Sequence, residues 1–326
     1  MMKASSRNYR RIFVTGLLVF SHASVFAFGL YTHKTRPAWY VELRQWMAPA
    51  TYQQQYFNKW MIPAHELAPV AKNVPENLDV YVLAGQSNMS GGDGSKKPDW
   101  LEERGDVFVF GYQDKWRVGR PPVHMEPPLT RQNEGFGPGL VYGNLLAKKT
   151  RRPVGLVPCA LGGTPIIHWE TSLSPDTLFG SCLRKAKAAS RKGQVRAMFF
   201  HHGEADANDL SGFARTGEWG DRFQRLVTDF RSGLGQPSLP VVFAQIGMTP
   251  PSSDRRSVGW KAVQDQQAAV DMSCVGMVKT DDLLYGEGLG VHLDVETFPV
   301  LAERVASRLS SLLESGCESH SGFTQN

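Results

Sequence analysis

The sequence lacks several features that would point to common classes of protein. It has no internal repeat, no low-complexity tract apart from a polar tail after Gly316, and no run of basic residues interleaved with aromatic ones. A nucleic-acid partner is therefore not expected. It has only four cysteines in 326 residues. No two of them have the spacing of metal ligands, so we expect no zinc site and no metal.

The positive charge is concentrated at the N-terminus. The net charge is +5 and the pI about 9.0, but Lys3, Arg7, Arg10 and Arg11 precede any acidic residue. An uncharged run follows, Ile12–Tyr31, about as long as a helix needs to cross a hydrocarbon core of roughly 30 Å. Residues 1–31 are therefore predicted to be a targeting segment.

Two interpretations of the targeting segment stay open. It is either a signal anchor or a cleaved signal peptide with Ala23 and Ala27 near the processing site. We favour the anchor because the run exceeds the apolar region of about 7–15 residues in a typical signal peptide. Either way we expect an extracytoplasmic protein, periplasmic or at the cell surface. It would be held at the membrane by one N-terminal helix, or secreted if the segment is cleaved.

An extracytoplasmic location would allow Cys159, Cys182, Cys274 and Cys317 to form disulfides. Four cysteines permit three connectivities, and the sequence does not choose among them. Buried free thiols are an equally good interpretation, since a domain of this size needs no covalent staples.

The rest of the chain divides into three parts. Residues 32–77 are predicted to form a juxtamembrane or wrapping segment, 78–315 a single domain and 316–326 a frayed tail. Within the domain, short apolar runs alternate with stretches of helical spacing. The predicted strands are Leu78–Ala84, Val107–Phe110, Pro153–Cys159, Val195–Phe200, Leu239–Ile246 and Val275–Lys279. The predicted helices are Gly139–Lys149, Leu178–Arg191, Gly220–Arg231, Val258–Val270 and Val300–Leu313. This order predicts an α/β fold with a mostly parallel sheet and helices on both faces.

Ligands of such sheets lie beyond the carboxyl ends of the strands, and chemically useful residues follow several predicted strands. Ser87 lies in the loop 85–92, where a nucleophile would be exposed, although Ser is also an ordinary helix cap. The paired glycines Gly162 and Gly163 can bring a backbone N–H close to a ligand, although they also suit a plain turn.

Two further loops carry titratable residues. One contains His201, His202, Glu204 and Asp206, and charged groups there are costly unless they are used or paired. Adjacent histidines point in different directions along a strand, so this cluster is not predicted to bind a metal. The other contains His292 between two apolar residues, a setting that is also typical of a packed core histidine.

Together the loops resemble those of the SGNH hydrolases, in particular the branch of sialate O-acetylesterases and carbohydrate esterase family 6. The resemblance covers about residues 78–313 and implies a flavodoxin-like three-layer α/β/α fold. It rests on blocks in the family's order and spacing: Gly85-Gln86-Ser87-Asn88-Met89, Gly135-Phe136-Gly137-Pro138-Gly139, Gly162-Gly163-Thr164, Gly203-Glu204-Ala205-Asp206 and Val291-His292-Leu293.

The resemblance implies a serine esterase that removes acetyl groups from carbohydrate without a cofactor. Ser87 would attack the ester, His292 would act as its base, and the N–H groups of Ser87 and Gly163 would hold the oxyanion. Substrate binding is assigned to Gln86, Asn88, Asp206 and Trp169. Trp116 and Trp219 are further candidates for stacking on sugars, although ordinary packing is the favoured interpretation of each tryptophan.

Two positions depart from the family pattern. The family usually has Asp three residues before the catalytic His, and this chain has Leu289 there. Glu204 is our first candidate for the missing acid, followed by Glu287 and Asp282. His202 stands where the family commonly has Gln, and it is assigned to the oxyanion hole or the substrate.

The departure at Leu289 leaves alternatives to hydrolysis open. The same Ser87 and His292 would serve an O-acetyltransferase in which a sugar hydroxyl replaces water. An inactive glycan-binding subunit is a third interpretation. The sequence determines neither the sugar nor the oligomeric state.

Overall fold

The computed structural model describes residues 68–92, 97–111, 114–124, 135–174, 177–208, 216–247, 254–286 and 290–317. They form seven strands: β1 (Leu78–Gly85), β2 (Val107–Gly111), β3 (Lys115–Val118), β4 (Val154–Pro158), β5 (Gly193–His201), β6 (Val241–Ala244) and β7 (Val275–Val278). The helices are α3 (Ser87–Ser90), α4 (Gly139–Thr150), α5 (Leu178–Ala189), α6 (Glu204–Asn208), α7 (Trp219–Leu234), α8 (Asp254–Ala268) and α9 (Phe298–Glu314). The 3-10 helices are η4 (Ile166–Trp169), η5 (Ser190–Lys192), η6 (Thr216–Glu218) and η7 (Val295–Thr297).

The strands form one sheet in the order β3-β2-β4-β1-β5-β6-β7. All neighbours are parallel except β2 and β3. This confirms the predicted α/β fold with a mostly parallel sheet. The six predicted strands are all present, with ends shifted by up to two residues.

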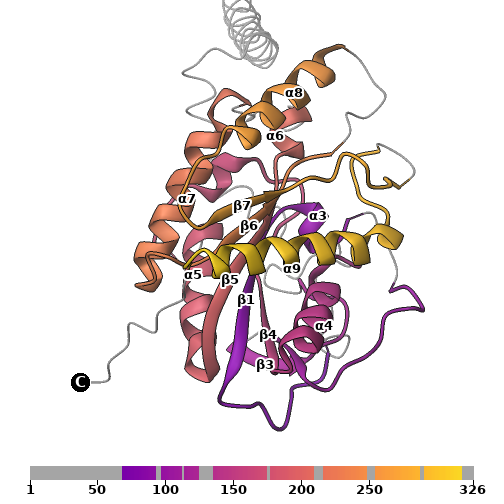
Figure 1. Ribbon diagram of the computed structural model, residues 1–326, viewed down its shortest axis with the longest axis vertical. Helices are drawn as coiled ribbons and strands as arrows, with labels where there is room; N and C mark the ends of the chain where they lie inside the picture. The colour runs from indigo at the N-terminus through magenta and orange to yellow at the C-terminus, as the bar shows by residue number, and fades with distance from the viewer. Residues whose placement is uncertain are drawn as a thin grey trace, which may run out of the picture. The chain divides into compact units, whose positions relative to one another are not determined.

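Side chains of the central strand β1 point alternately into two cores, because successive residues of a strand face opposite sides of a sheet. Val80 and Val82 join a core with residues of α5, α7 and α8, whereas Tyr81 and Leu83 join one with residues of α4 and α9. Helices therefore cover both faces of the sheet (Figure 1). A central parallel strand is buried on both sides, and every residue of β1 is buried.

Strand β3 was not predicted, because its four residues, Lys-Trp-Arg-Val, have too few apolar side chains to signal a strand. It forms an antiparallel hairpin with β2 at the edge of the sheet. The described end of the predicted wrapping segment lies along this edge. Ala71 donates to the carbonyl of Trp116 at 3.0 Å, and Val118 donates to that of Pro69 at 3.0 Å.

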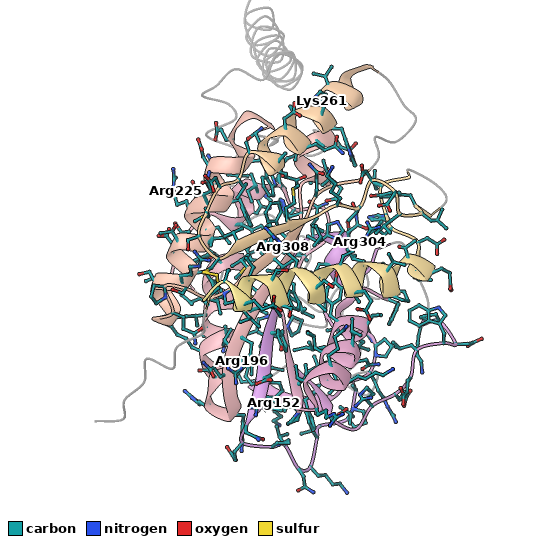
Figure 2. The ribbon with its side chains drawn as sticks, viewed as in Figure 1. Arg152, Arg196, Arg225, Lys261, Arg304 and Arg308 are labelled. Carbon is teal, nitrogen blue, oxygen red and sulfur yellow. A yellow bond between two sulfur atoms is a disulfide. The ribbon has the colours of Figure 1, made fainter. Side chains whose placement is uncertain are left out.

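The opposite end of β1 from the loops is held by a buried carboxylate. Asp79, which is 4% exposed, accepts from Arg152 Nε at 2.9 Å and from Arg196 Nε at 2.8 Å. Both arginines lie by the lower end of β1 (Figure 2). The two charge-assisted hydrogen bonds offset the cost of burying the carboxylate. They also tie β1 to residues that flank β4 and lie within β5.

No helix among the described residues is long and apolar enough to cross a bilayer. The predicted targeting segment, residues 1–31, lies outside them, as does most of the tail. Anchoring and the predicted domain limits stay predictions.

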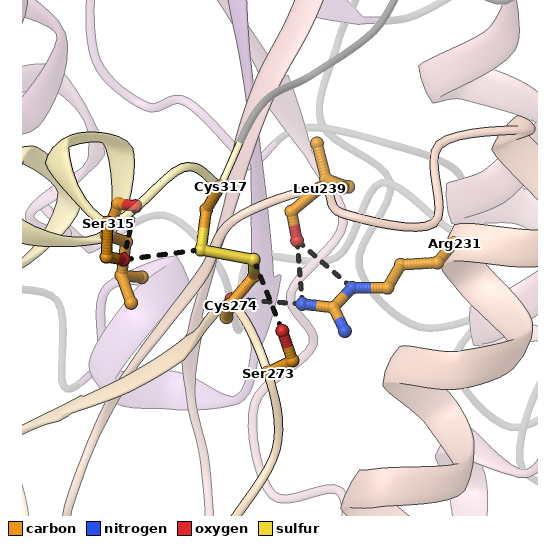
Figure 3. Close-up of a disulfide and its surroundings, with 7 residues drawn as sticks. Arg231, Leu239, Ser273, Cys274, Ser315 and Cys317 are labelled. Atoms are coloured by element: carbon orange, nitrogen blue, oxygen red, sulfur yellow. Dashed lines mark hydrogen bonds between the residues drawn. A yellow bond between two sulfur atoms is a disulfide. The ribbon is translucent and has the colours of Figure 1, made fainter.

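The four cysteines form two disulfides, Cys159–Cys182 and Cys274–Cys317. The first joins the end of β4 to α5, and the second joins the residue before β7 to the end of α9. Beside the second, Arg231 donates from Nε and a terminal nitrogen to the carbonyl of Leu239, and from that same terminal nitrogen to the carbonyl of Cys274 (Figure 3).

The Cys274–Cys317 bond closes a loop with a sequence separation of 43 residues. Loop-closure entropy then predicts that a Cys274→Ser, Cys317→Ser variant loses about 2–4 kcal/mol of unfolding free energy. Urea unfolding followed by circular dichroism checks this. In a strong reductant the variant and the wild type should unfold at similar urea concentrations. Equal midpoints without reductant would contradict the expected stabilisation.

Candidate active site

Ser87 is separated from the central strand by Gln86 alone, and it begins the one-turn helix α3. Gly85, the last residue of β1, has a φ of +126°, and a Cβ atom there would lie 2.1 Å from the carbonyl oxygen of His201 in β5. Only glycine permits this conformation and this approach. The chain can therefore turn sharply out of the sheet, and it leaves the side chain of Ser87 partly exposed.

His292 lies in the loop between β7 and α9. The main chain around it pairs with residues 284–286, because Gly286 N donates to His292 O and Asp294 N donates to Leu284 O, both at 2.9 Å. Its ring nitrogen Nε2 lies 2.9 Å from Ser87 Oγ. The structure thus brings together the predicted nucleophile and its predicted base, which are 205 residues apart in the sequence.

A second glycine-rich segment packs against the nucleophile loop. Cβ atoms on Gly135 and Gly137 would lie 2.7 and 2.4 Å from the main chain of Gly91 and Met89. A Cβ atom on Gly92 would lie 2.8 Å from His292 Nε2. These glycines allow two loops and the imidazole to pack closely, which accounts for the predicted block at 135–139.

Gly163 lies in the loop after β4, next to the loop that carries Ser87. Leu161 N donates to Gly85 O at 3.1 Å, and the hydroxyl of Thr164 donates to Leu161 O at 2.7 Å. Gly163 is exposed with a φ of +69°. Its backbone is therefore open to solvent, and its role as an oxyanion donor stays a prediction.

Asn88 is buried and bonds to three groups. Its Nδ2 donates to Glu204 Oε1 at 2.5 Å and to Val291 O at 2.8 Å, and its Oδ1 accepts from Leu293 N at 2.9 Å. At 4% exposure it cannot contact a substrate directly. The assignment of Asn88 to substrate binding is therefore wrong, because its amide is used within the protein.

The sequence separates Glu204 from His292 by 88 residues, and the described partners of Glu204 are Asn88 and His201. Its Oε1 accepts from Asn88 and lies 3.5 Å from His201 Nε2, and its buried Oε2 has no hydrogen-bond partner in the described structure. Burial lowers the pKa of His201, Glu204 opposes this shift and His292 adds to it. The predicted role of Glu204 as the acid that orients His292 is not what the structure shows.

Asp282 is also occupied elsewhere. It pairs with Arg304 of α9 through both carboxylate oxygens, at 2.6 and 2.5 Å. This pairing lowers its pKa to about 2. Glu287 and Leu289 lie outside the described residues, so Glu287 stays a predicted candidate.

Three more residues assigned to the substrate lie inside the protein. Gln86 Oε1 accepts from the main chain of Gly203 and Ala205 at 3.4 Å, and Asp206 accepts from Ile166 N at 2.9 Å. Trp169 is 2% exposed and packs edge-on against a phenylalanine ring. These side chains hold the loops in place, and their assignment to direct substrate contact is corrected.

His202 is likewise a core residue, 0% exposed. Trp219 Nε1 donates to its Nδ1 at 3.2 Å, and its ring stacks on Phe200. Burial lowers its pKa to about 3, so it is neutral. Its assignment to the oxyanion hole or substrate is corrected, because its ring has no access to solvent.

The tryptophans considered for sugar contact are packed inside the protein, which is the interpretation that the sequence favoured. Trp116, Trp169 and Trp219 are all buried. Among the tryptophans in the described ranges, Trp100 alone is exposed, at 39%. Its exposure has no signal in the local sequence, since it depends on the loop around it.

No group of three or more His, Cys, Asp or Glu side chains in the described part of the chain is arranged to hold a metal ion. The arrangement of Ser87 and His292 instead suits acyl transfer, in which a hydroxyl attacks a carbonyl and an imidazole carries its proton.

Comparison with known proteins agrees with this chemistry. A family model described as "Carbohydrate esterase, sialic acid-specific acetylesterase" matches residues 77–311. A probable carbohydrate esterase of Arabidopsis thaliana is 27% identical over an alignment of 198 positions, which covers 55% of this chain and 73% of that protein.

Solved structures show the same fold. The X-ray structure of the Arabidopsis protein matches with a TM-score of 0.61 and 23% identity, covering 72% of this chain and 98% of that one. The structure of NanS matches with a TM-score of 0.55 and 15% identity, covering 75% and 99%. A carbohydrate acetylesterase from Xanthomonas citri matches with a TM-score of 0.53 and 15% identity, covering 73% and 56%.

The family model spans more than half of the 326 residues, and its match includes every block around Ser87 and His292. The chain therefore belongs to the family of sialic acid-specific acetylesterases among the carbohydrate esterases, and it is a carboxylic ester hydrolase.

Proposed function

We propose that this enzyme removes O-acetyl groups from a carbohydrate through an acetyl-enzyme on Ser87, with His292 as general base. The observation that carries the proposal is the 2.9 Å separation between Ser87 Oγ and His292 Nε2. Both side chains are partly exposed, so a substrate can reach them. Carbohydrate acetylesterases among the relatives support the choice of substrate class.

The reaction would proceed in two stages. Ser87 Oγ attacks the acetyl carbonyl carbon while its proton passes to His292 Nε2, and the protonated imidazole returns that proton to the departing sugar oxygen. Water then attacks the acetyl carbonyl carbon with His292 again as base, the imidazolium returns the proton to Ser87 Oγ as the C–Oγ bond breaks, and acetic acid leaves. Each stage forms one C–O bond and breaks another.

Two backbone donors suit the oxyanion formed in both stages. Ser87 begins a helical turn, so its N–H is among the donors that a helix leaves unpaired at its start. Gly163 offers a second N–H from the loop after β4, which is fastened to the end of β1 by the Leu161–Gly85 hydrogen bond. Such donors lower the barrier because they are already oriented when charge develops.

The mechanism predicts that Ser87→Ala and His292→Ala each lower kcat on an acetate ester by about 10⁴-fold or more. Chromogenic acetate hydrolysis by the purified protein measures this. Ser310→Ala, on the exposed face of α9, is a matched control that should retain full activity. A wild type no faster than Ser87→Ala would reject hydrolysis. It would then favour acetyl transfer to a sugar or glycan binding without catalysis.

The described tryptophan available to stack on a sugar ring is Trp100, because it is exposed and Trp116, Trp169 and Trp219 are buried. Its Nε1 donates to both carboxylate oxygens of Glu296, at 3.1 and 3.0 Å, and its ring packs edge-on against Phe136. These contacts fix the indole beside the loop that carries His292. Trp100 also lines a depression of about 240 Å³.

The lining of that depression suits a sugar ring, which has apolar faces and polar edges. Leu101, Val141 and Pro299 supply apolar surface, and Asn144 and Lys148 supply polar groups. The volume lies below the roughly 300–1,000 Å³ typical of drug-sized ligands. One ring of a longer glycan is therefore the fitting occupant.

Loss of the indole should affect a glycan and a small ester differently. Trp100→Ala is expected to raise KM for an acetylated oligosaccharide by about two- to tenfold, the worth of one aromatic contact. The kcat/KM for an aryl acetate should change by less than about twofold, and Trp100→Phe should restore most of the oligosaccharide affinity. Equal changes for both substrates would show that Trp100 acts on the catalytic groups and not on the sugar.

We further propose that the enzyme works in an oxidising, extracytoplasmic compartment. The two disulfides support this, since such bonds persist mainly outside the cytosol. Mass spectrometry of protein isolated with its thiols blocked at lysis tests the proposal. Alkylated Cys159 or Cys274 in that protein would argue against it.

A further inference from the structure

We infer that Asn88 is the positioning residue for His292, and that Glu204 serves it as a hydrogen-bond acceptor. This inference rests on the proposed function, because it concerns how the base is held against Ser87. It gives roles to two buried polar residues that do not contact the reacting groups. It also explains how the His292 loop is held when the family's usual Asp is replaced by Leu289.

Asn88 forms hydrogen bonds with the residues immediately before and after His292. Val291 O accepts from Nδ2 at 2.8 Å, and Leu293 N donates to Oδ1 at 2.9 Å. One amide therefore holds the carbonyl before His292 and the N–H after it. A residue whose flanking peptide groups are both fixed has little freedom to shift or rotate its main chain.

The position of Asn88 next to Ser87 means that these hydrogen bonds connect the nucleophile and the base. It directly follows Ser87 and lies in the same helical turn, α3. The side chain of Asn88 therefore holds the main chain around His292 in place relative to the main chain of Ser87. The distance between Ser87 Oγ and His292 Nε2 depends on both.

Glu204 fixes the amide itself. Its Oε1 accepts the second Nδ2 hydrogen at 2.5 Å, so both donors and the acceptor of Asn88 are used. An Asn side chain flipped by 180° would place its oxygen against this carboxylate and its NH₂ against Leu293 N. The carboxylate thus selects one orientation of the amide.

Burial separates this arrangement from the substrate. Asn88 is 4% exposed and Glu204 is 3% exposed. Neither touches the substrate, so they act through His292. Misplacement of a catalytic group by about 1 Å can cost about 10²-fold in rate, which sets the size of the expected effects.

The central test compares two isosteric substitutions. Asn88→Asp retains the acceptor toward Leu293 N but replaces the NH₂ donor with an oxygen that opposes Val291 O and Glu204. Glu204→Gln retains an oxygen that can accept from Asn88. We expect Asn88→Asp to lower kcat by about 10²-fold with KM changed less than threefold, and Glu204→Gln to lower it by less than about tenfold. Asn73→Asp, at an exposed position in the segment before β1, is the matched control and should match the wild type.

Two further readouts separate positioning from a general loss of structure. The rate at which a small fluorophosphonate labels Ser87 should fall in Asn88→Asp by the same factor as kcat. The ratio of Asn88→Asp to wild-type activity should rise as pH falls, because the new carboxyl group, once protonated, can donate to Glu204.

If Asn88→Asp does not fold, Glu204→Ala is the deciding variant, since it removes the acceptor that Glu204→Gln keeps. Its kcat should fall well below that of Glu204→Gln.

The outcomes distinguish this inference from the proposed function. An active wild type with Asn88→Asp within threefold of it overturns the positioning role and leaves the esterase intact. A loss of about 10⁴-fold in Glu204→Gln, the size seen when a triad acid is removed, also overturns it, because the charge itself would then act on His292. A wild type without Ser87-dependent hydrolysis rejects the proposed function instead.

Discussion

The active site depends on how closely the carboxyl end of β1 approaches that of β5. Gly85 is stacked against the main chain of His201, and Gln86 N donates to His201 O at 2.9 Å. The chain must turn out of the sheet at this point, so Ser87 projects beyond it. The loops after β4 and β5, and the loop that carries His292, are then positioned relative to this turn. A side chain at Gly85 would separate the two strands and displace all of them.

Polar residues beneath the loops do much of the positioning. Gln86 binds the main chain that begins α6, Asp206 binds the main chain that begins η4, and Asn88 binds the main chain around His292. Each lies in one segment that follows a strand and satisfies the backbone of another segment. Irregular segments cannot satisfy their own N–H and C=O groups as helices and strands do. Buried amides and carboxylates supply the missing partners and set the spacing between loops.

This arrangement changes the significance of the family's acidic block. Glu204 is the first residue of α6, and it is connected to the site through its hydrogen bond with Asn88. Asp282, the other described acid that was considered, is bound to Arg304. Membership of the esterase family is carried by the match over residues 77–311, and the chemistry is centred on Ser87 and His292.

The sequence alone determined the order of strands and helices, the loop of Ser87 and the loops of Gly163 and His292. These follow from local patterns, since apolar periodicity and glycine content are properties of neighbouring residues. Only the tertiary structure decided which polar side chains face a substrate and which are buried. Gln86, Asn88, His202 and Trp169 have the composition of a binding site, yet all four are buried, and Gln86 and Asn88 are bound by residues more than a hundred positions away. The disulfide pairing depended on the fold for the same reason, because each bond joins separate segments of the chain.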